Sequence, residues 1–95
     1  MSLQAEQKLK LVRAILLDPF HAYPGLTVRE REAATLASRG IGGDTIGKIL
    51  GTGRRNGYRI LEMAAAKIGE QDDRKAFTWT DLPVMMYEML AEAVK

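Results

Sequence analysis

The chain has 95 residues, of which 46% are apolar and 27% charged, with a formal net charge of +2. These values fit one small soluble domain, 1–95, and exclude a membrane-spanning helix, which needs about eighteen consecutive apolar residues. The absence of cysteine excludes disulfides and cysteine-ligated metals and suits a reducing compartment. The first residues lack the basic and apolar regions of a secretory signal, so we expect a cytoplasmic protein.

The first segment, residues 1–25, predicts a helix followed by a connector. Apolar residues recur at helical spacing over residues 3–17, and Pro19 then prevents the helix from continuing. The connector, residues 18–25, contains two prolines and one glycine. It also holds His21, the only histidine, which has no nearby nucleophile and is expected to be a solvated or packed residue rather than a catalytic one.

The middle segment, residues 26–69, opens with a clearly marked helix. Thr27 and Glu30 have the spacing of a capping box, in which each side chain accepts a hydrogen bond from the backbone of the other residue. Gly40 stands where a left-handed residue often follows the end of a helix. We therefore expect this helix to end near residue 39.

Two more helices are expected in the same segment. A short helix is predicted over residues 44–50, with Asp44 as its N-cap and with three inward-facing apolar residues, Ile46, Ile49 and Leu50. A glycine-containing turn at 51–53 precedes a longer helix, predicted over 54–68 and ending at Gly69. Four residues of this longer helix share the inward face: Gly57, Leu61, Ala64 and Ile68.

The last segment, residues 70–95, predicts a polar linker and an amphipathic helix over 81–94. Pro83 lies in the first turn of this helix, where proline is tolerated. One face carries an apolar stripe, which consists of Leu82, Met85, Met86, Met89, Leu90 and Ala93. The chain as a whole is therefore expected to be all-α, with about five helices.

Positive charge is concentrated in the middle segment. Residues 26–69 hold eight Lys or Arg against four Asp or Glu, whereas residues 70–95 hold three against six. No acidic residue lies between Asp44 and Glu62. Such runs are often only a solvated face, but a local positive patch on a nearly neutral chain also suits a polyanionic partner.

The middle segment also carries a family pattern. Its matching positions are Leu26-Thr27, Arg29-Glu30-Arg31-Glu32, Leu36, Gly40, Ile46, Leu50-Gly51, Leu61 and Lys67-Ile68-Gly69. In this order and spacing they resemble the helix-turn-helix domain of the LuxR/GerE family of bacterial regulators. The resemblance covers 44 residues and implies that helices 44–50 and 54–68 form the helix-turn-helix, with the second entering the major groove of DNA.

The chain departs from the family pattern at the start of the expected recognition helix. A Ser-x-x-Thr-Val run is usual in the family, and Gly53, Asn56 and Gly57 stand in those positions. Gly57 lowers helix propensity by about 1 kcal/mol relative to alanine and removes core volume. Gly47, where the family prefers alanine, would let the two helices approach closely. For Gly57 three alternatives remain: tight packing on a bulky neighbour, a helix that is flexible until bound, or a motif that has lost its DNA role.

The resemblance assigns candidate DNA contacts. The positions that read bases correspond to Tyr58, Arg59 and Glu62, and those near phosphates to Thr45, Lys48, Arg54, Arg55 and Asn56. An arginine can bind guanine through two hydrogen bonds, and the other arginines neutralise phosphate. Tyr58 is equally consistent with packing around Gly57, and Glu62 either accepts a hydrogen bond from cytosine or repels phosphate.

These patterns predict a transcriptional regulator that binds double-stranded DNA. The run Gly42-x-x-x-x-Gly47-Lys48 nearly matches a phosphate-binding loop, but Ile49 replaces the Ser or Thr that holds magnesium, and no strand precedes it. We therefore expect no enzyme activity, cofactor, metal or small-molecule substrate. The alternative is a protein-interaction module on the same fold, of the anti-activator type.

A homodimer is also expected, because members of the family usually bind two half-sites as dimers. The predicted dimer interface is the apolar stripe of the last helix, at Leu82, Met85, Met86, Met89 and Leu90. Such a stripe is more often core than interface, and a small domain has limited capacity to bury it alone.

Overall fold

A computed structural model describes the chain over residues 2–95, with side chains from residue 4 onward. Over that range the chain is all-helical, as the sequence predicts. The elements are α1 (Ser2–Leu17), α2 (Val28–Ser38), α3 (Gly43–Leu50), α4 (Arg54–Gln71), the short 3-10 helix η1 (Trp79–Asp81) and α5 (Leu82–Ala93). None of the helices in the described range is long and apolar enough to cross a membrane.

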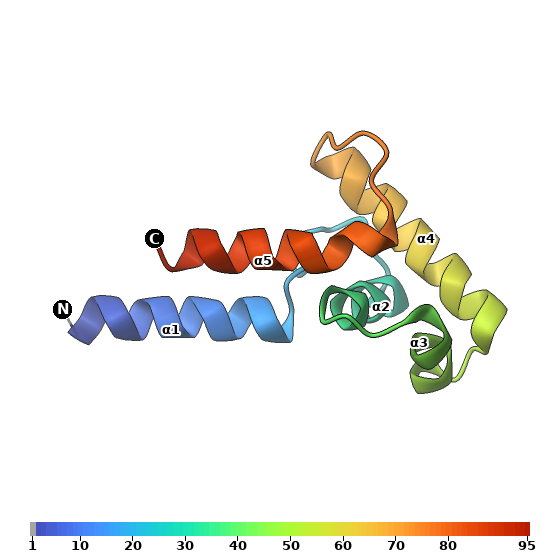
Figure 1. Ribbon diagram of the computed structural model, residues 1–95, viewed down its shortest axis with the longest axis horizontal. Coiled ribbons are helices and arrows are strands. Elements are labelled where there is room, and N and C mark those ends of the chain that lie inside the picture. The colour runs from blue at the N-terminus through green and yellow to red at the C-terminus, as the bar shows by residue number, and fades with distance from the viewer. Residues whose placement is uncertain (1) are drawn as a thin grey trace.

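The helices form two parts of different character, as Figure 1 shows. Helices α2, α3 and α4 pack against one another and form the main body, and the first part of α5 covers α2. Helix α1 and the rest of α5 lie side by side, antiparallel, and project away from that body. The molecule is consequently elongated, with extents of 48 × 28 × 21 Å.

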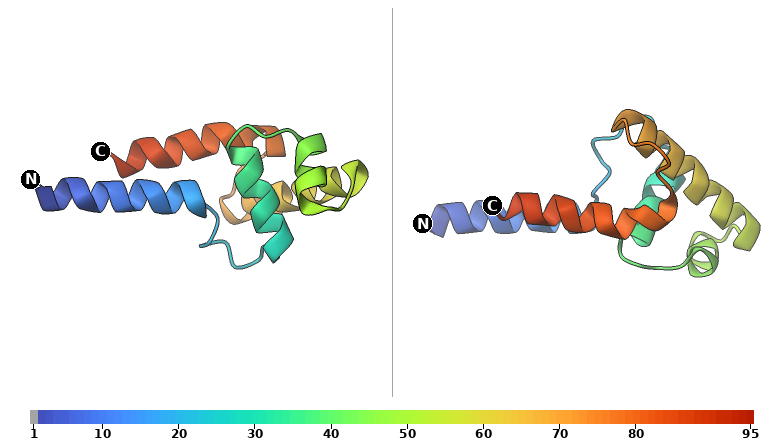
Figure 2. Two further views of the ribbon diagram at one scale, coloured as in Figure 1. Left: turned by 90° about the horizontal axis from the view of Figure 1, so that it is seen from below. Right: turned by 45° about the horizontal axis from the view of Figure 1, so that its top comes forward.

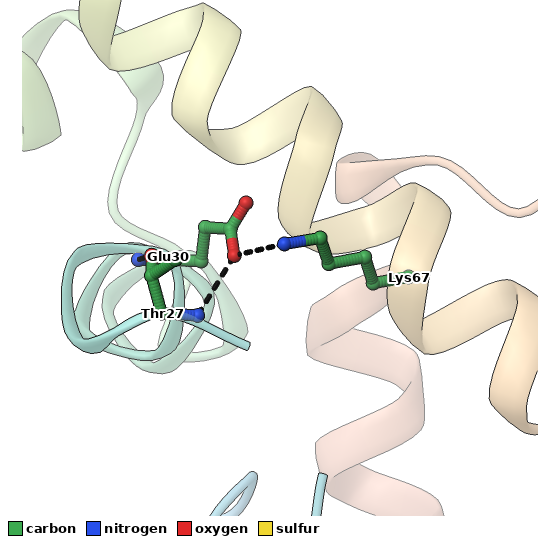
Figure 3. A network of polar contacts seen from close by, with 3 residues as sticks. All are labelled: Thr27, Glu30 and Lys67. Carbon is green, nitrogen blue, oxygen red and sulfur yellow. Dashed lines mark hydrogen bonds and ion pairs between the residues drawn. The ribbon is translucent and has the colours of Figure 1, made fainter. Parts of the chain in front are cut away.

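The start of α2 is the capping box that the sequence predicts. The backbone N–H of Glu30 donates to Thr27 Oγ1 at 3.1 Å, and the N–H of Thr27 donates to Glu30 Oε1 at 2.8 Å. The same carboxylate oxygen accepts a hydrogen bond from Lys67 Nζ on α4 at 2.7 Å (Figure 3). The cap of one helix is therefore also the tie between α2 and α4.

The ionisation of Glu30 is linked to this geometry. Burial raises the pKa of Glu30, but the hydrogen bonds from Lys67 and Thr27, together with the Lys67 charge, outweigh burial and lower the pKa below its usual value of 4.5. A carboxyl group whose pKa is lower in the folded state stabilises the fold above its unfolded pKa. That stabilisation is lost as the pH falls through the folded pKa.

We therefore expect the free energy of unfolding to decrease as the pH falls below 4.5, and Glu30→Gln should make this decrease shallower. Urea denaturation at several pH values between about 7 and about 3 measures the slope. The matched control is Glu32→Gln, because Glu32 lies on the same helix but is exposed. Equal slopes for the parent and the Glu30→Gln variant would contradict the assignment.

The core draws its side chains from α2, α3, α4, α5 and the connector before α2. Its largest fully buried side chains are Phe20, Ile46, Leu61, Ile68 and Leu82. The inward row predicted for α4 is confirmed, since Gly57, Leu61, Ala64 and Ile68 are all buried. Phe20 was not among the predicted core residues; it comes from the connector and fills space that the alanine-rich faces of α2 and α4 leave open.

Helix α3 differs from prediction in its N-cap and in its inward face. Asp44 is not the N-cap of α3, because the helix already begins at Gly43 and Gly42 takes the cap position. Ile49 does not face inward and is 56% exposed, because the inner face of α3 is formed by its glycines and Ile46. The first misassignment came from reading Asp44 as a cap when it belongs to the first turn, where its charge also suits the helix dipole.

Helix α4 is longer than predicted and continues past Gly69 to Gln71. A glycine often ends a helix by taking a positive φ, but Gly69 is not among the glycines that do so. It is buried, and a Cβ placed there would lie 3.0 Å from the Cβ of Phe77. This glycine therefore serves close packing of the linker on α4.

The stripe predicted as a dimer interface is mostly internal. Leu82, Met85 and Met86 are buried within a single chain, and Met89 and Leu90 are partly buried. The first part of α5 thus completes the core over α2, so the first three residues offer no surface to a second copy. This corrects the expectation that all five residues form the dimer interface.

Candidate functional site

Helices α3 and α4 cross at unusually short range because three glycines face one another. A Cβ placed on Gly57 of α4 would lie 2.7 Å from the Cα of Gly47, and one placed on Gly47 would lie 2.4 Å from the carbonyl oxygen of Gly53. Gly43, one turn before Gly47, is buried under the ring of Tyr58. The neighbour of Gly57 is thus the backbone of another helix, rather than a bulky side chain.

The turn between the two helices also depends on glycine. Gly51 ends α3 with a φ of +69°, and its N–H donates to the carbonyls of Gly47 and Lys48. Gly53 is the N-cap of α4 and has a φ of +81°. Residues with a Cβ rarely adopt such angles, so the turn and the close crossing together fix how α4 projects from the body.

The exposed side of α4 gathers most of the predicted contact residues. Five of the eight line one open depression of about 560 Å³: Arg54, Arg55, Tyr58, Arg59 and Glu62. The first turn of α4 contains no acidic residue, and its N-cap Gly53 supplies no side-chain hydrogen bond. Three guanidinium groups and the positive end of a helix dipole therefore share one surface.

The other three predicted residues lie around this depression rather than in it. Thr45 and Lys48 are exposed on α3. Asn56 lines a second open depression of about 560 Å³, formed with parts of α2 and of the α3–α4 turn. Arg59 lines both depressions, so it stands at the centre of the exposed basic surface.

Two acidic groups moderate the charge of this surface. Asp44 Oδ1 lies 2.8 Å from Arg54 Nε, in an ion pair whose two side chains are both well exposed. An exposed pair of this kind contributes about 0–1 kcal/mol, so Arg54 can exchange Asp44 for a phosphate at small cost. Glu62 closes the C-terminal end of the depression.

Tyr58 serves as a packing residue in this structure. Its ring covers Gly43 and meets the ring of Trp79 edge-on, with centroids 5.7 Å apart and an interplanar angle of 64°. The side chain is half-buried. The tyrosine thereby connects α4 with α3 and η1, and it fills space beside Gly43 rather than around Gly57.

Arg29 and Trp79 belong to the site and were missed by sequence reasoning. The guanidinium of Arg29 on α2 donates to the carbonyl oxygen of Leu50 at 3.0 Å and thus caps the end of α3. The sequence offered no clue to this contact, because Arg29 lies in the first turn of α2, where the free backbone groups are N–H donors, and the carbonyl that it binds belongs to another helix. Trp79 gave no clue either, since it lies in a polar linker with no periodicity.

The arrangement provides a basic surface that is exposed, open and held by rigid helix packing. Within the described residues, no group of three or more His, Cys, Asp or Glu is placed to hold a metal ion. An open surface with several arginines can bind an extended polyanion through charge-assisted hydrogen bonds. Comparisons with protein-family models, with curated proteins and with solved structures find no match for this chain.

Proposed function

We propose that the chain is a transcriptional regulator that binds double-stranded DNA through α4, with α3 and α4 acting as a LuxR-like helix-turn-helix. In this proposal α4 enters the major groove and Arg59 contacts base edges. Arg54, Arg55 and Lys48 neutralise phosphates. Tyr58 holds α4 against α3 and η1, and binding takes place in the cytoplasm.

One observation carries the proposal. Residues chosen from the sequence for a family role fall on one exposed surface, where Arg54, Arg55 and Arg59 lie together around an open depression. A charged face that only contacts solvent does not need its helix to be held in a fixed position. Here the glycine crossing holds the arginine-bearing helix firmly against the body, as base recognition requires.

The alternative function is a protein-interaction module that uses the same surface without reading DNA. Asp44 and Glu62 favour it, because acidic groups beside the arginines repel phosphate but suit a partner protein with mixed charges. The two functions differ in salt dependence and in the class of ligand, so one binding series separates them.

The test is DNA binding measured by fluorescence anisotropy, with a random duplex and with duplexes from upstream of the protein's own gene. If Lys48, Arg54 and Arg55 each neutralise one phosphate, the logarithm of affinity falls with the logarithm of salt at a slope of about −2.7. Between 50 and 200 mM salt this corresponds to a loss of roughly 40-fold.

The variant for this test replaces the three arginines of α4 with alanine. Arg54→Ala, Arg55→Ala and Arg59→Ala together should remove binding and leave helicity nearly unchanged, because all three side chains are exposed. The matched control removes the same charge elsewhere, at the exposed residues Lys10, Lys75 and Lys95, and should retain most of the affinity. If the parent binds no duplex with salt-sensitive affinity, DNA binding is excluded and the interaction module is favoured.

A further inference from the structure

An exposed ion pair joins the first turns of α3 and α4. Asp44 Oδ1 lies 2.8 Å from Arg54 Nε, and the two side chains are 56% and 78% exposed. Asp44 belongs to the first turn of α3, and Arg54 is the first residue of α4. Figures 1 and 2 show α3 beside the start of α4, at the end of the molecule away from the two chain ends. The pair therefore lies at the N-terminal edge of the basic depression, which Arg54 lines.

The pair is not needed to hold the two helices together. The glycine crossing already fixes α4 on α3, and water screens two charges that are this exposed. The pair of Glu30 with Lys67 is different, because the Glu30 side chain is only 8% exposed and its carboxylate also caps α2. Asp44 suits the dipole of α3, but that interaction requires no contact with Arg54.

Arg54 differs in this respect from the other two arginines of the depression. In the part of the chain that the structure describes, neither Arg55 nor Arg59 forms an ion pair. The other acid of the depression, Glu62, is eight residues beyond Arg54 and so about 12 Å further along α4. One of three guanidinium groups is consequently neutralised by the protein itself, at the end of α4 that is proposed to meet phosphates.

We infer that Asp44 competes with phosphate for Arg54 and thereby weakens the binding of duplex DNA to α4. The inference rests on the proposed function and makes Asp44 a residue that sets the affinity of that site. A guanidinium binds carboxylate and phosphate through the same N–H groups. A phosphate that approaches Arg54 Nε must therefore displace a carboxylate that is already there.

The displaced carboxylate opposes binding in a second way. Asp44 is on a helix that the glycine crossing holds in place, so its charge stays close to the bound phosphate. Two negative charges at short range repel each other, and a cation retained beside Asp44 relieves this repulsion. Binding then releases fewer cations, which makes it both weaker and less dependent on salt.

The effect of Asp44 does not depend on base sequence. The competition concerns the phosphate backbone, which is chemically the same in every duplex. Asp44 should therefore lower the affinity for a random duplex and for a duplex from upstream of the gene by the same factor. A carboxylate that accepted a hydrogen bond from cytosine would instead raise the affinity for one sequence.

Asp44→Asn tests the inference by fluorescence anisotropy, because it removes the charge and keeps the size of the side chain. We expect the affinity for both duplexes to rise roughly 5-fold at about 50 mM salt, the upper range for releasing an exposed ion pair. The slope of the logarithm of affinity against that of salt should steepen by up to about 0.9 and reach about −2.7, the value for three neutralised phosphates. The gain should therefore fall below about 2-fold at about 200 mM salt.

Glu92→Gln is the matched control. Glu92 forms an ion pair with Lys95 at 3.1 Å, and both side chains are well exposed. The variant removes the same charge from the same kind of pair, but near the C-terminal end of the chain, away from α3 and the start of α4 (Figure 1). Its affinity for either duplex should stay within about 1.5-fold of the parent, because salt screens charges at that separation.

Arg54→Ala separates competition from general repulsion. If Asp44 acts through Arg54, Asp44→Asn should raise the affinity by less than about 2-fold in an Arg54→Ala background. Equal affinities of the parent and Asp44→Asn, a gain confined to one duplex, or an undiminished gain without Arg54 would each overturn the inference and leave the proposed function standing. If neither the parent nor Asp44→Asn binds any duplex, the proposed function fails and the inference fails with it.

Discussion

Gly57→Ala is expected to lower the free energy of unfolding by about 1–3 kcal/mol, although alanine is the better helix former by about 1 kcal/mol. The added methyl group would lie 2.7 Å from the Cα of Gly47 and 3.3 Å from the carbonyl oxygen of Gly43. Both are backbone atoms, which have no rotamer through which to move aside. The two helices must therefore separate, and the melting temperature should fall by roughly 5–20 °C.

Two companion variants show whether the close crossing causes this loss. Gly47→Ala should destabilise to a similar extent, because its methyl group would meet the backbone of Gly53. Gly42→Ser adds a side chain in the same stretch where nothing lies within 4 Å, and serine suits the N-cap position, so its effect should be within a few tenths of a kcal/mol. A melting temperature raised by Gly57→Ala would mean that the position is a vacant cavity.

The reason for Gly57 could not be found from its own surroundings in the sequence. A glycine in a helix indicates lost side-chain volume. The sequence left open whether Gly57 allows close packing of its helix or makes that helix flexible. The answer lies in Gly47 and Gly53, which approach from another helix and from the turn. Gly47, Gly53 and Gly57 are separate in the sequence but belong to one contact between α3, α4 and the turn that joins them.

Local patterns predicted the features that depend on neighbouring residues. The Thr27–Glu30 capping box and the inward row of α4 are present as expected, because caps and helical periodicity are set within a few residues. The candidate contact residues of α4 were instead named from the family resemblance. Five of these residues line one depression because their spacing puts them on the same face of a single helix.

Features that join distant segments were not predictable in this way. The contact of Tyr58 with Trp79 joins the start of α4 to η1, and the linker that contains η1 has no periodic pattern. Periodicity likewise indicates that one face of α5 is apolar but not what covers it. The body of the same chain covers Leu82 and Met85, and this moves any dimer contact to other residues.

Phe20 is the clearest case of a core residue that periodicity does not reveal. It lies in the connector between α1 and α2, yet its side chain is fully buried in the core. The ring of Tyr23 is 5.7 Å away, and the Tyr23 hydroxyl donates to Asp72 at 2.7 Å, just beyond the end of α4. Burial and this hydrogen bond both raise the pKa of Tyr23. The connector is thus attached to the body at two points.

Phe20→Ala should therefore reduce the free energy of unfolding by about 3–5 kcal/mol, the range for removing a buried aromatic ring from a core. Since small domains have about 5–15 kcal/mol in total, this variant should be partly unfolded at physiological temperature. Urea denaturation measures the loss, with His21→Ala as the control, because His21 is the exposed next residue and should change stability by less than about 0.5 kcal/mol. A loss below about 1 kcal/mol for Phe20→Ala would show that the connector lies outside the cooperative core. Helix α1 would then be held on the body only through its packing on α5.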